Sequence, residues 1–202
     1  MGKQSMSKIR KRILVLIGVI LVCAYIVRVY YVNKDVDIPV IKEYSLGTEV
    51  PYEKDYTNDS TECIDGYAAT VLGYEVLSRE EVYSRCGQNA EEESDGDNEY
   101  YVLVNASFAN ESFDQGETMG VNLYNTPIVC VNEYVILDRQ LFEMLNPDMP
   151  GVGFSLRQGT SKDVTLVYHI RKGTFKDKQE IEDADFKLQI TEYPTQKLLK
   201  LK

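Results

Sequence analysis

ILVLIGVILVCAYIVRVYYV, residues Ile13 to Val32, is the stretch that decides how this chain is organised. Within this stretch the first charged residue is Arg28. A helix of this length rises roughly 30 Å at 1.5 Å per residue, which matches the thickness of a bilayer core. A soluble domain of this size has no need of such an apolar run. We therefore predict a transmembrane helix over residues 13–32, preceded by a basic tail over residues 1–12.

The flanks of this stretch predict its orientation. Arg10, Lys11 and Arg12 precede it, and residues 1–32 contain no Asp or Glu. The positive-inside rule then keeps the N-terminus cytoplasmic and places residues 33–202 outside the cell. Near the outer end, the long side chain of Arg28 can reach the headgroups, and tyrosines such as Tyr30 and Tyr31 are favoured at that interface. The pattern is typical of an uncleaved signal anchor in a single-pass protein of the cell membrane.

Two other interpretations of the segment stay open. Val22, Cys23 and Ala24 offer small or tolerated residues where a signal peptidase cuts, and cleavage near Ala24 would release a secreted domain. Lipidation of Cys23 is the other alternative, although Val22 is a poor substitute for the small residue that precedes such cysteines. Against cleavage, the apolar run continues beyond Ala24 without a polar or helix-breaking residue.

Charge and length bound the remainder of the chain. Residues 33–202 contain 16 of the 22 Lys and Arg and all 32 Asp and Glu, which gives a formal charge of −16. So acidic a surface disfavours nucleic acid as a partner. Polar residues 33–45 show no periodicity and predict a stalk, and residues 46–202 have room for one extracellular domain.

Short alternating segments predict a β domain. The clearest is residues 163–171, where Val164, Leu166, Tyr168 and Ile170 share one face. Further strands are expected over residues 46–52, 66–77, 100–108, 119–124, 127–131, 154–156 and 186–190. With turn signals between them, they predict a mainly β fold, an antiparallel immunoglobulin-like sandwich with one or two short helices.

Two helix starts can be identified from their capping residues. Ser78 and Glu81 have the spacing of a capping box, and Gly87 is placed to end the helix that follows. Asp138 can cap a second short helix, which ends at Asn146-Pro147.

Few residues suggest chemistry. His169, the single histidine of the chain, falls on the outward face of its strand, and Ser155 lacks the flanking glycines of a nucleophile elbow. We therefore expect no enzymatic activity. In the acidic stretch 91–99, Asp95, Asp97 and Glu99 alternate, and their oxygens suit calcium. An EF-hand begun at Asp95 would need Gly at position 100 and Glu at position 106, where the chain has Tyr and Ala. The stretch predicts a solvated loop or a weak calcium site, and no other cofactor is expected.

The external cysteines are odd in number, so at least one does not pair within the chain. Cys63 and Cys86 lie outside the strongest strand patterns and are a disulfide candidate, expected to stabilise the domain by about 3 kcal/mol if it forms. Cys130, within an apolar segment, is interpreted as a buried small hydrophobic residue.

Three stretches carry a resemblance to a known family. GYAATVLGYEVLSREEVYSRCG from Gly66, EYYVLVNASFANES from Glu99 and FSLRQGTSKDVTLVYHI from Phe154 are similar in layout to telokin-like, immunoglobulin-like domains of unknown function on membrane-anchored proteins of Gram-positive bacteria. The resemblance implies a sandwich and transfers no catalytic residue. The three external cysteines depart from it.

Together these features predict a non-enzymatic cell-surface protein. Its extracellular domain is expected to bind or support another envelope component, such as a neighbouring membrane protein. The alternatives are a surface sensor that captures a ligand or cation through the acidic loop or a tyrosine patch, and the secreted domain described above.

Overall fold

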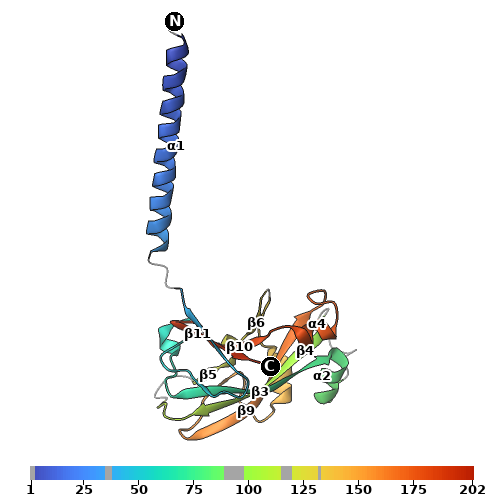
Figure 1. Ribbon diagram of the computed structural model, residues 1–202. Coiled ribbons are helices and arrows are strands. Elements are labelled where there is room, and N and C mark those ends of the chain that lie inside the picture. Colours follow the sequence, from blue (N-terminus) through green and yellow to red (C-terminus); the bar gives the residue numbers. More distant parts are fainter. Residues whose placement is uncertain (1–2, 35–37, 89–97, 115–119, 132) are drawn as a thin grey trace. The chain divides into compact units, whose positions relative to one another are not determined.

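The computed structural model describes residues 3–34, 38–88, 98–114, 120–131 and 133–202 (Figure 1). The chain divides into two compact units, Met1–Ile38 and Pro39–Lys202. The first unit contains one long helix, and the second contains the strands and the remaining helices.

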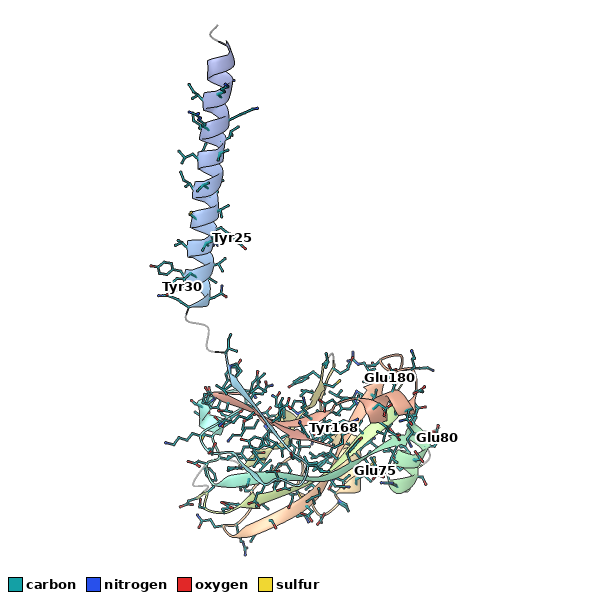
Figure 2. All side chains as sticks on the ribbon, in the orientation of Figure 1. Tyr25, Tyr30, Glu75, Glu80, Tyr168 and Glu180 are labelled. Atoms are coloured by element: carbon teal, nitrogen blue, oxygen red, sulfur yellow. The ribbon has the colours of Figure 1, made fainter. Side chains whose placement is uncertain are left out.

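Helix α1, Lys3–Asn33, includes the whole predicted apolar segment. Its side chains are exposed from Lys8 onward, including Leu14 at 67% and Tyr25 at 69%. Figure 2 shows Tyr25 and Tyr30 extending away from the helix. Residues Lys8–Asn33 are long and apolar enough to cross a membrane, a test that a signal sequence near the N-terminus also passes.

The second unit is mostly β, with a few short helices. Its strands are β1 Val40–Tyr44, β2 Val50–Pro51, β3 Tyr67–Ser78, β4 Asn98–Asn110, β5 Val121–Asn122, β6 Ile128–Cys130, β7 Glu133–Val135, β8 Gly153–Phe154, β9 Thr160–Arg171, β10 Lys187–Thr191 and β11 Thr195–Lys200. Its helices are α2 Arg79–Arg85, α3 Arg139–Leu145 and α4 Lys178–Asp183, with 3₁₀ turns η1 Ser60–Glu62 and η2 Leu123–Asn125.

One sheet is antiparallel, in the order β2-β3-β4-β9. Its long strands coincide with the strongest alternating patterns, because each has a face that must be buried. The register of β3 against β4 shifts between Val71 and Gly73, as at a β-bulge, and Leu72 is left 51% exposed. In β4, Leu103 and its chain neighbours Val102 and Val104, which face the opposite side of the sheet, are fully buried, so both faces of this central strand are covered.

The second sheet has the order β1-β11-β10-β6-β7, in which β1 runs parallel to β11 and the other pairs are antiparallel. Strand β1 occupies residues assigned above to a stalk, so the stalk prediction is corrected there. The reason is that β1 is held by backbone pairing while the side chains of residues 40–43 stay exposed, and such a strand has no alternating pattern to detect.

The main hydrophobic cluster draws on both sheets, for example Val104 and Leu166 from one and Ile128 and Leu188 from the other. A second cluster lies on β3, β4 and β9 under helices α2 and α3. The coarse prediction of a mainly β fold with antiparallel sheets is confirmed.

Both predicted helix caps are present. At α2, the Glu81 N–H donates to Ser78 Oγ and the Ser78 N–H donates to Glu81 Oε2, which completes the capping box, and Gly87 follows with φ of 72°. At α3, the Leu141 N–H donates to Asp138 Oδ1 at 3.0 Å. The expected strand at 119–124 is instead the two-residue β5 followed by η2.

Candidate functional site

The predicted membrane flanks all lie on α1. Arg10, Lys11 and Arg12 occupy its N-terminal part, and Arg28, Tyr30 and Tyr31 its last turns, with every one of these side chains exposed. The rings of Tyr30 and Tyr31 meet edge to face with centroids 5.8 Å apart.

The structure does not bring Cys63 and Cys86 together, and both carry free thiols. Cys63 follows η1 and donates to the Glu53 carbonyl, whereas Cys86 ends α2. The twelve residues of β3 separate the two segments, and a strand of that length spans roughly 40 Å, whereas a disulfide needs Cα atoms within about 7 Å. Burial raises the pKa of the Cys86 thiol, with a further contribution from the Asp138 carboxylate, so this thiol stays protonated at neutral pH.

The calcium candidates lie outside the part of the chain that the structure describes. Asp95 and Asp97 fall within residues 89–97, and the side chain of Glu99 at the start of β4 is likewise not described. Among the described residues, no group of three or more His, Cys, Asp and Glu side chains is arranged to hold a metal ion.

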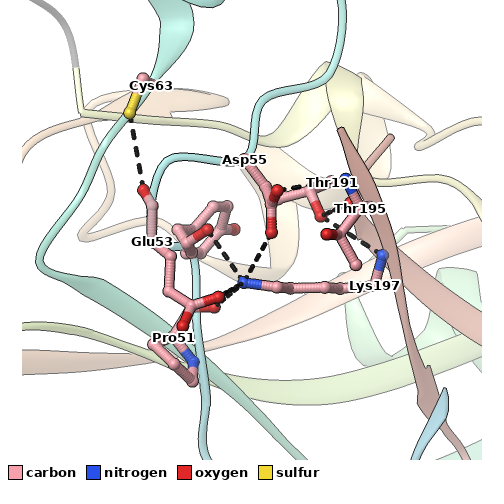
Figure 3. A network of polar contacts seen from close by, with 8 residues as sticks. Pro51, Glu53, Asp55, Cys63, Thr191, Thr195 and Lys197 are labelled. Atoms are coloured by element: carbon pink, nitrogen blue, oxygen red, sulfur yellow. Dashed lines mark hydrogen bonds and ion pairs between the residues drawn. The ribbon is translucent and has the colours of Figure 1, made fainter. Parts of the chain in front are cut away.

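A fully buried lysine forms the most distinctive polar centre of the domain. Lys197 of β11 has a side chain with no exposed surface, and its Nζ donates to the backbone oxygens of Pro51 at 2.7 Å and Tyr52 at 3.0 Å. Figure 3 shows this ammonium group reaching from β11 to the loop that follows β2. A buried ammonium group without such partners would be strongly destabilising, so the loop and strand are positioned by each other.

Two carboxylates complete the surroundings of Lys197. Glu53 Oε2 lies 2.7 Å from Nζ and Asp55 Oδ2 lies 2.8 Å from it (Figure 3). The two differ in exposure, since the side chain of Glu53 is 60% exposed and that of Asp55 only 7%. The second oxygen of Asp55, Oδ1, accepts from the Thr195 N–H at 3.1 Å.

The backbone at Glu53 is unusual. Its φ of 55° is the one positive value at a non-glycine position among the described residues. Side chains rarely adopt this left-handed conformation, and it persists where the surroundings enforce it. Here it accompanies the turn that brings the carbonyls of residues 51 and 52 and both carboxylates to one nitrogen atom.

A cavity of about 250 Å³ lies against the same loop. Its wall contains polar side chains, including Asp55, Glu62, Asn122 and Asn125, as well as Tyr56 and aliphatic side chains such as Ile190. Glu62 Oε2 already accepts from the Asn58 N–H and from Asn125 Nδ2. The cavity therefore offers hydrogen-bonding groups whose charge is partly compensated within the protein.

Tyr52 also contributes to the wall of this cavity, and its hydroxyl is buried without a hydrogen-bond partner. Burial raises the pKa of Tyr52 well above its ordinary value. The neighbouring Tyr168 hydroxyl, by contrast, donates to the Thr126 carbonyl at 2.6 Å. An unpaired buried hydroxyl is unusual in a folded protein and marks a place where a bound polar group would be stabilised.

Comparison with known protein families assigns most of this chain to one family. Residues 41–197 match DUF5028, a domain of unknown function, and this match covers most of the chain. The chain belongs to the DUF5028 family. No curated protein and no solved structure matches it.

The single histidine of this DUF5028 protein lies close to an acid. His169 Nδ1 is 3.5 Å from Asp138 Oδ2, too long for a good hydrogen bond, and this buried nitrogen has no other partner. Burial by itself raises the pKa of Asp138, but His169 and the Leu141 N–H outweigh it and hold that pKa below its usual value. Since the nearby Cys86 thiol is protonated, this group gives no activated nucleophile.

Sequence reasoning missed the Lys197 centre of the DUF5028 domain. Lys197 precedes Leu198 and Leu199 in a six-residue strand that was not predicted, and nothing in the sequence singles out Glu53 or Asp55. The available signal was a lysine next to an apolar pair near the end of the domain. Only the pairing of β11 with β1 and β10 shows which face of this strand is buried.

Proposed function

We propose that this protein is anchored in the cell membrane by α1, with its N-terminus in the cytoplasm and the DUF5028 domain displayed outside. The observation that supports this is the helix itself, whose span Lys8–Asn33 is apolar and has exposed side chains. An exposed apolar helix of this length is stable in a bilayer and not in water. The basic residues before it support the proposed orientation.

Topology can be tested with single cysteines. In a chain whose native cysteines are replaced, Lys8→Cys reports on the tail and Val131→Cys, at a position 94% exposed, reports on the domain. With intact cells and a membrane-impermeant maleimide, we expect labelling at position 131, and at position 8 only after lysis. Labelling in the opposite sense would contradict the orientation.

Retention of the helix needs a separate measurement. Alkaline carbonate washing of membranes, followed by N-terminal sequencing of the retained protein, should give a chain that still contains residues 13–32. A mature N-terminus at Tyr25 would replace the anchor with a cleaved signal peptide, and a lipid on Cys23 would support the third interpretation.

For the displayed domain we propose a non-enzymatic role, binding or supporting another envelope or membrane protein. The supporting surface is the hairpin of β6 and β7, at the edge of its sheet, where Tyr134 is 61% exposed and Ile136 54% exposed. Beside it lies a groove of about 430 Å³ lined by Val131 and Phe175 together with acidic side chains such as Glu180. A partner segment with both apolar and basic residues fits this chemistry.

A photocrosslinking amino acid at Val131 tests this surface in the native membrane. We expect it to trap a discrete membrane-protein partner, while the same amino acid at the exposed Lys172 traps none. Equal, diffuse crosslinking from both positions would contradict a binding role for the hairpin.

A second candidate, capture of a small ligand, is favoured by the polar cavity beside Tyr52. Its volume corresponds to about eight water molecules, so it suits a compact polar molecule such as a single sugar unit. Thermal denaturation with glucose and with N-acetylglucosamine tests this, since a ligand at 100 times its Kd adds about 2.7 kcal/mol. A shift that Asn125→Ala abolishes supports the site, and unchanged curves with both sugars count against it.

Three further parts of the proposal concern fold and cofactors. We propose that the two larger sheets form an immunoglobulin-like sandwich, which the shared hydrophobic cluster supports, and that the telokin-like resemblance reflects this layout. We also propose that the domain needs no cofactor. Calcium would act only at the acidic loop around Asp95, Asp97 and Glu99, and titration calorimetry without heat at millimolar calcium would remove it.

A further inference from the structure

We propose that Lys197 and Asp55 join covalently, through an isopeptide bond between the lysine Nζ and the aspartate side-chain carboxyl carbon. Nothing in the proposed function requires this bond. It would be formed once by the folded chain, within the Lys197 centre, and would not involve an external substrate.

The reacting groups are already held together. Nζ lies 2.8 Å from Asp55 Oδ2, and the side chains of Lys197 and Asp55 are 0% and 7% exposed. The strand β11 holds one group and the turn at Glu53 holds the other, so little freedom remains to be lost before reaction. Proximity of this kind replaces a bimolecular encounter and accounts for much of the acceleration in intramolecular reactions.

Glu53 is placed to move the protons. Its Oε2 lies 2.7 Å from the same Nζ, so it can accept a proton from the ammonium group and leave a nucleophilic amine. The amine nitrogen attacks Asp55 Cγ, and the C–N bond forms while the bond from Cγ to Oδ2 breaks. Oδ2 leaves as water, with its protons delivered through Glu53. The net change is one ammonium and one carboxylate giving one amide and one water molecule.

The other oxygen of Asp55 is held where negative charge develops during this attack. Oδ1 accepts from the Thr195 N–H at 3.1 Å, a backbone donor fixed at the start of β11. Such a donor stabilises the oxygen of a tetrahedral intermediate. The two Asp55 oxygens therefore have different surroundings, one suited to remain as the amide oxygen and the other to leave.

The product relieves an unfavourable feature of the folded state. Lys197 and Asp55 are buried charges, and taking a charge pair out of water carries a desolvation penalty that mutual attraction only partly offsets. The amide is neutral, and its N–H can donate to the carbonyl of Pro51 or Tyr52, which lie 2.7 and 3.0 Å from Nζ. The side chains of Lys197 and Asp55 have little or no exposed surface, so the product amide would be largely shielded from bulk solvent.

Intact mass spectrometry of the full-length protein under denaturing conditions tests the proposal. We expect the wild-type mass to be lower than the sequence mass by one water molecule, and proteolysis to give a branched peptide that joins the segments containing residues 55 and 197. The variants K197R and E53Q should show the full sequence mass. K200R, which alters the exposed partner of Glu43, should keep the water loss.

Two results would overturn the proposal. One is a wild-type protein with the full sequence mass. The other is a water loss that persists in K197R and maps to an Asp-Gly pair, such as Asp65-Gly66, where a cyclic succinimide has the same mass change. Because the wild-type chain is itself measured, failure of a variant to fold does not affect either result.

Discussion

Removing the hydroxyl of Tyr168 should destabilise the protein, whereas removing the hydroxyl of Tyr52 should not. Both rings are buried, at 5% and 0% exposure, but only Tyr168 has a hydrogen-bond partner, the Thr126 carbonyl at 2.6 Å. Tyr168→Phe loses this bond and leaves the carbonyl unpaired, which costs about 1–3 kcal/mol. Tyr52→Phe removes a hydroxyl that is desolvated without compensation, so the free energy of unfolding should stay the same or rise by about 1 kcal/mol or more.

The two variants are matched, because each deletes the same atom from the same kind of side chain in one region of the core. Thermal denaturation of the full-length protein in mild detergent, followed by circular dichroism, measures the difference. For a domain of this size 1 kcal/mol corresponds to roughly 2–4 °C, so the two melting temperatures should differ by at least about 2 °C. Equal destabilisation by both variants would refute the reasoning, since Tyr52 would then have a partner in solution.

Three other predictions follow from the same structure. Burial raises the pKa of Tyr52 and of Tyr168, so the pH-dependent stability linked to their protonation is complete below pH about 10 and falls as the pH rises further. In denaturant titrations, a variant with Phe at both positions should lose less of its free energy of unfolding at alkaline pH than the wild type does. The pKa of Asp138 is lowered in the folded protein, so the stability that Asp138 contributes is present above pH about 4 and falls as the pH drops through its folded-state pKa. Asp138→Asn should therefore reduce the loss of stability at acidic pH, and an unchanged dependence of stability on pH would contradict this. Gly66→Ala should destabilise the domain by about 1–3 kcal/mol, because φ at this position is 103° and a Cβ would lie 2.7 Å from the Phe113 nitrogen. At Gly73 an added Cβ meets no atom within 4 Å, so Gly73→Ala should be neutral or slightly stabilising in the same thermal melts.

The sequence was informative where burial is one-sided and local. Strands β4 and β9 were predicted because alternate side chains enter the core, and α2 because Ser78 and Glu81 are only three residues apart. These signals depend on a few neighbouring residues, so a single sequence contains them in full. The apolar helix α1 is the extreme case, since its composition alone predicts its environment.

The missed features depend on residues that are distant in the chain. Strand β1 has exposed side chains and is held by the backbone of β11, about 155 positions later, so its residues resemble a linker. The same limit applies to the Lys197 centre. Glu53 and Asp55 are ordinary loop residues until β11 brings a buried ammonium group to them, and composition cannot show that pairing.

These two missed features share strand β11, and that has a mechanical consequence. A pull transmitted along the chain from α1 enters the β domain at β1, which is paired with β11. Lys197 in β11 is in turn fixed to the loop after β2 by Glu53 and Asp55. Strand β11 therefore resists displacement through two attachments, its backbone pairing with β1 and the Lys197 centre, which joins it to the loop after β2. A covalent Lys197–Asp55 bond would keep the second attachment even after the strands come apart, whereas an ion pair alone would be lost with the folded structure.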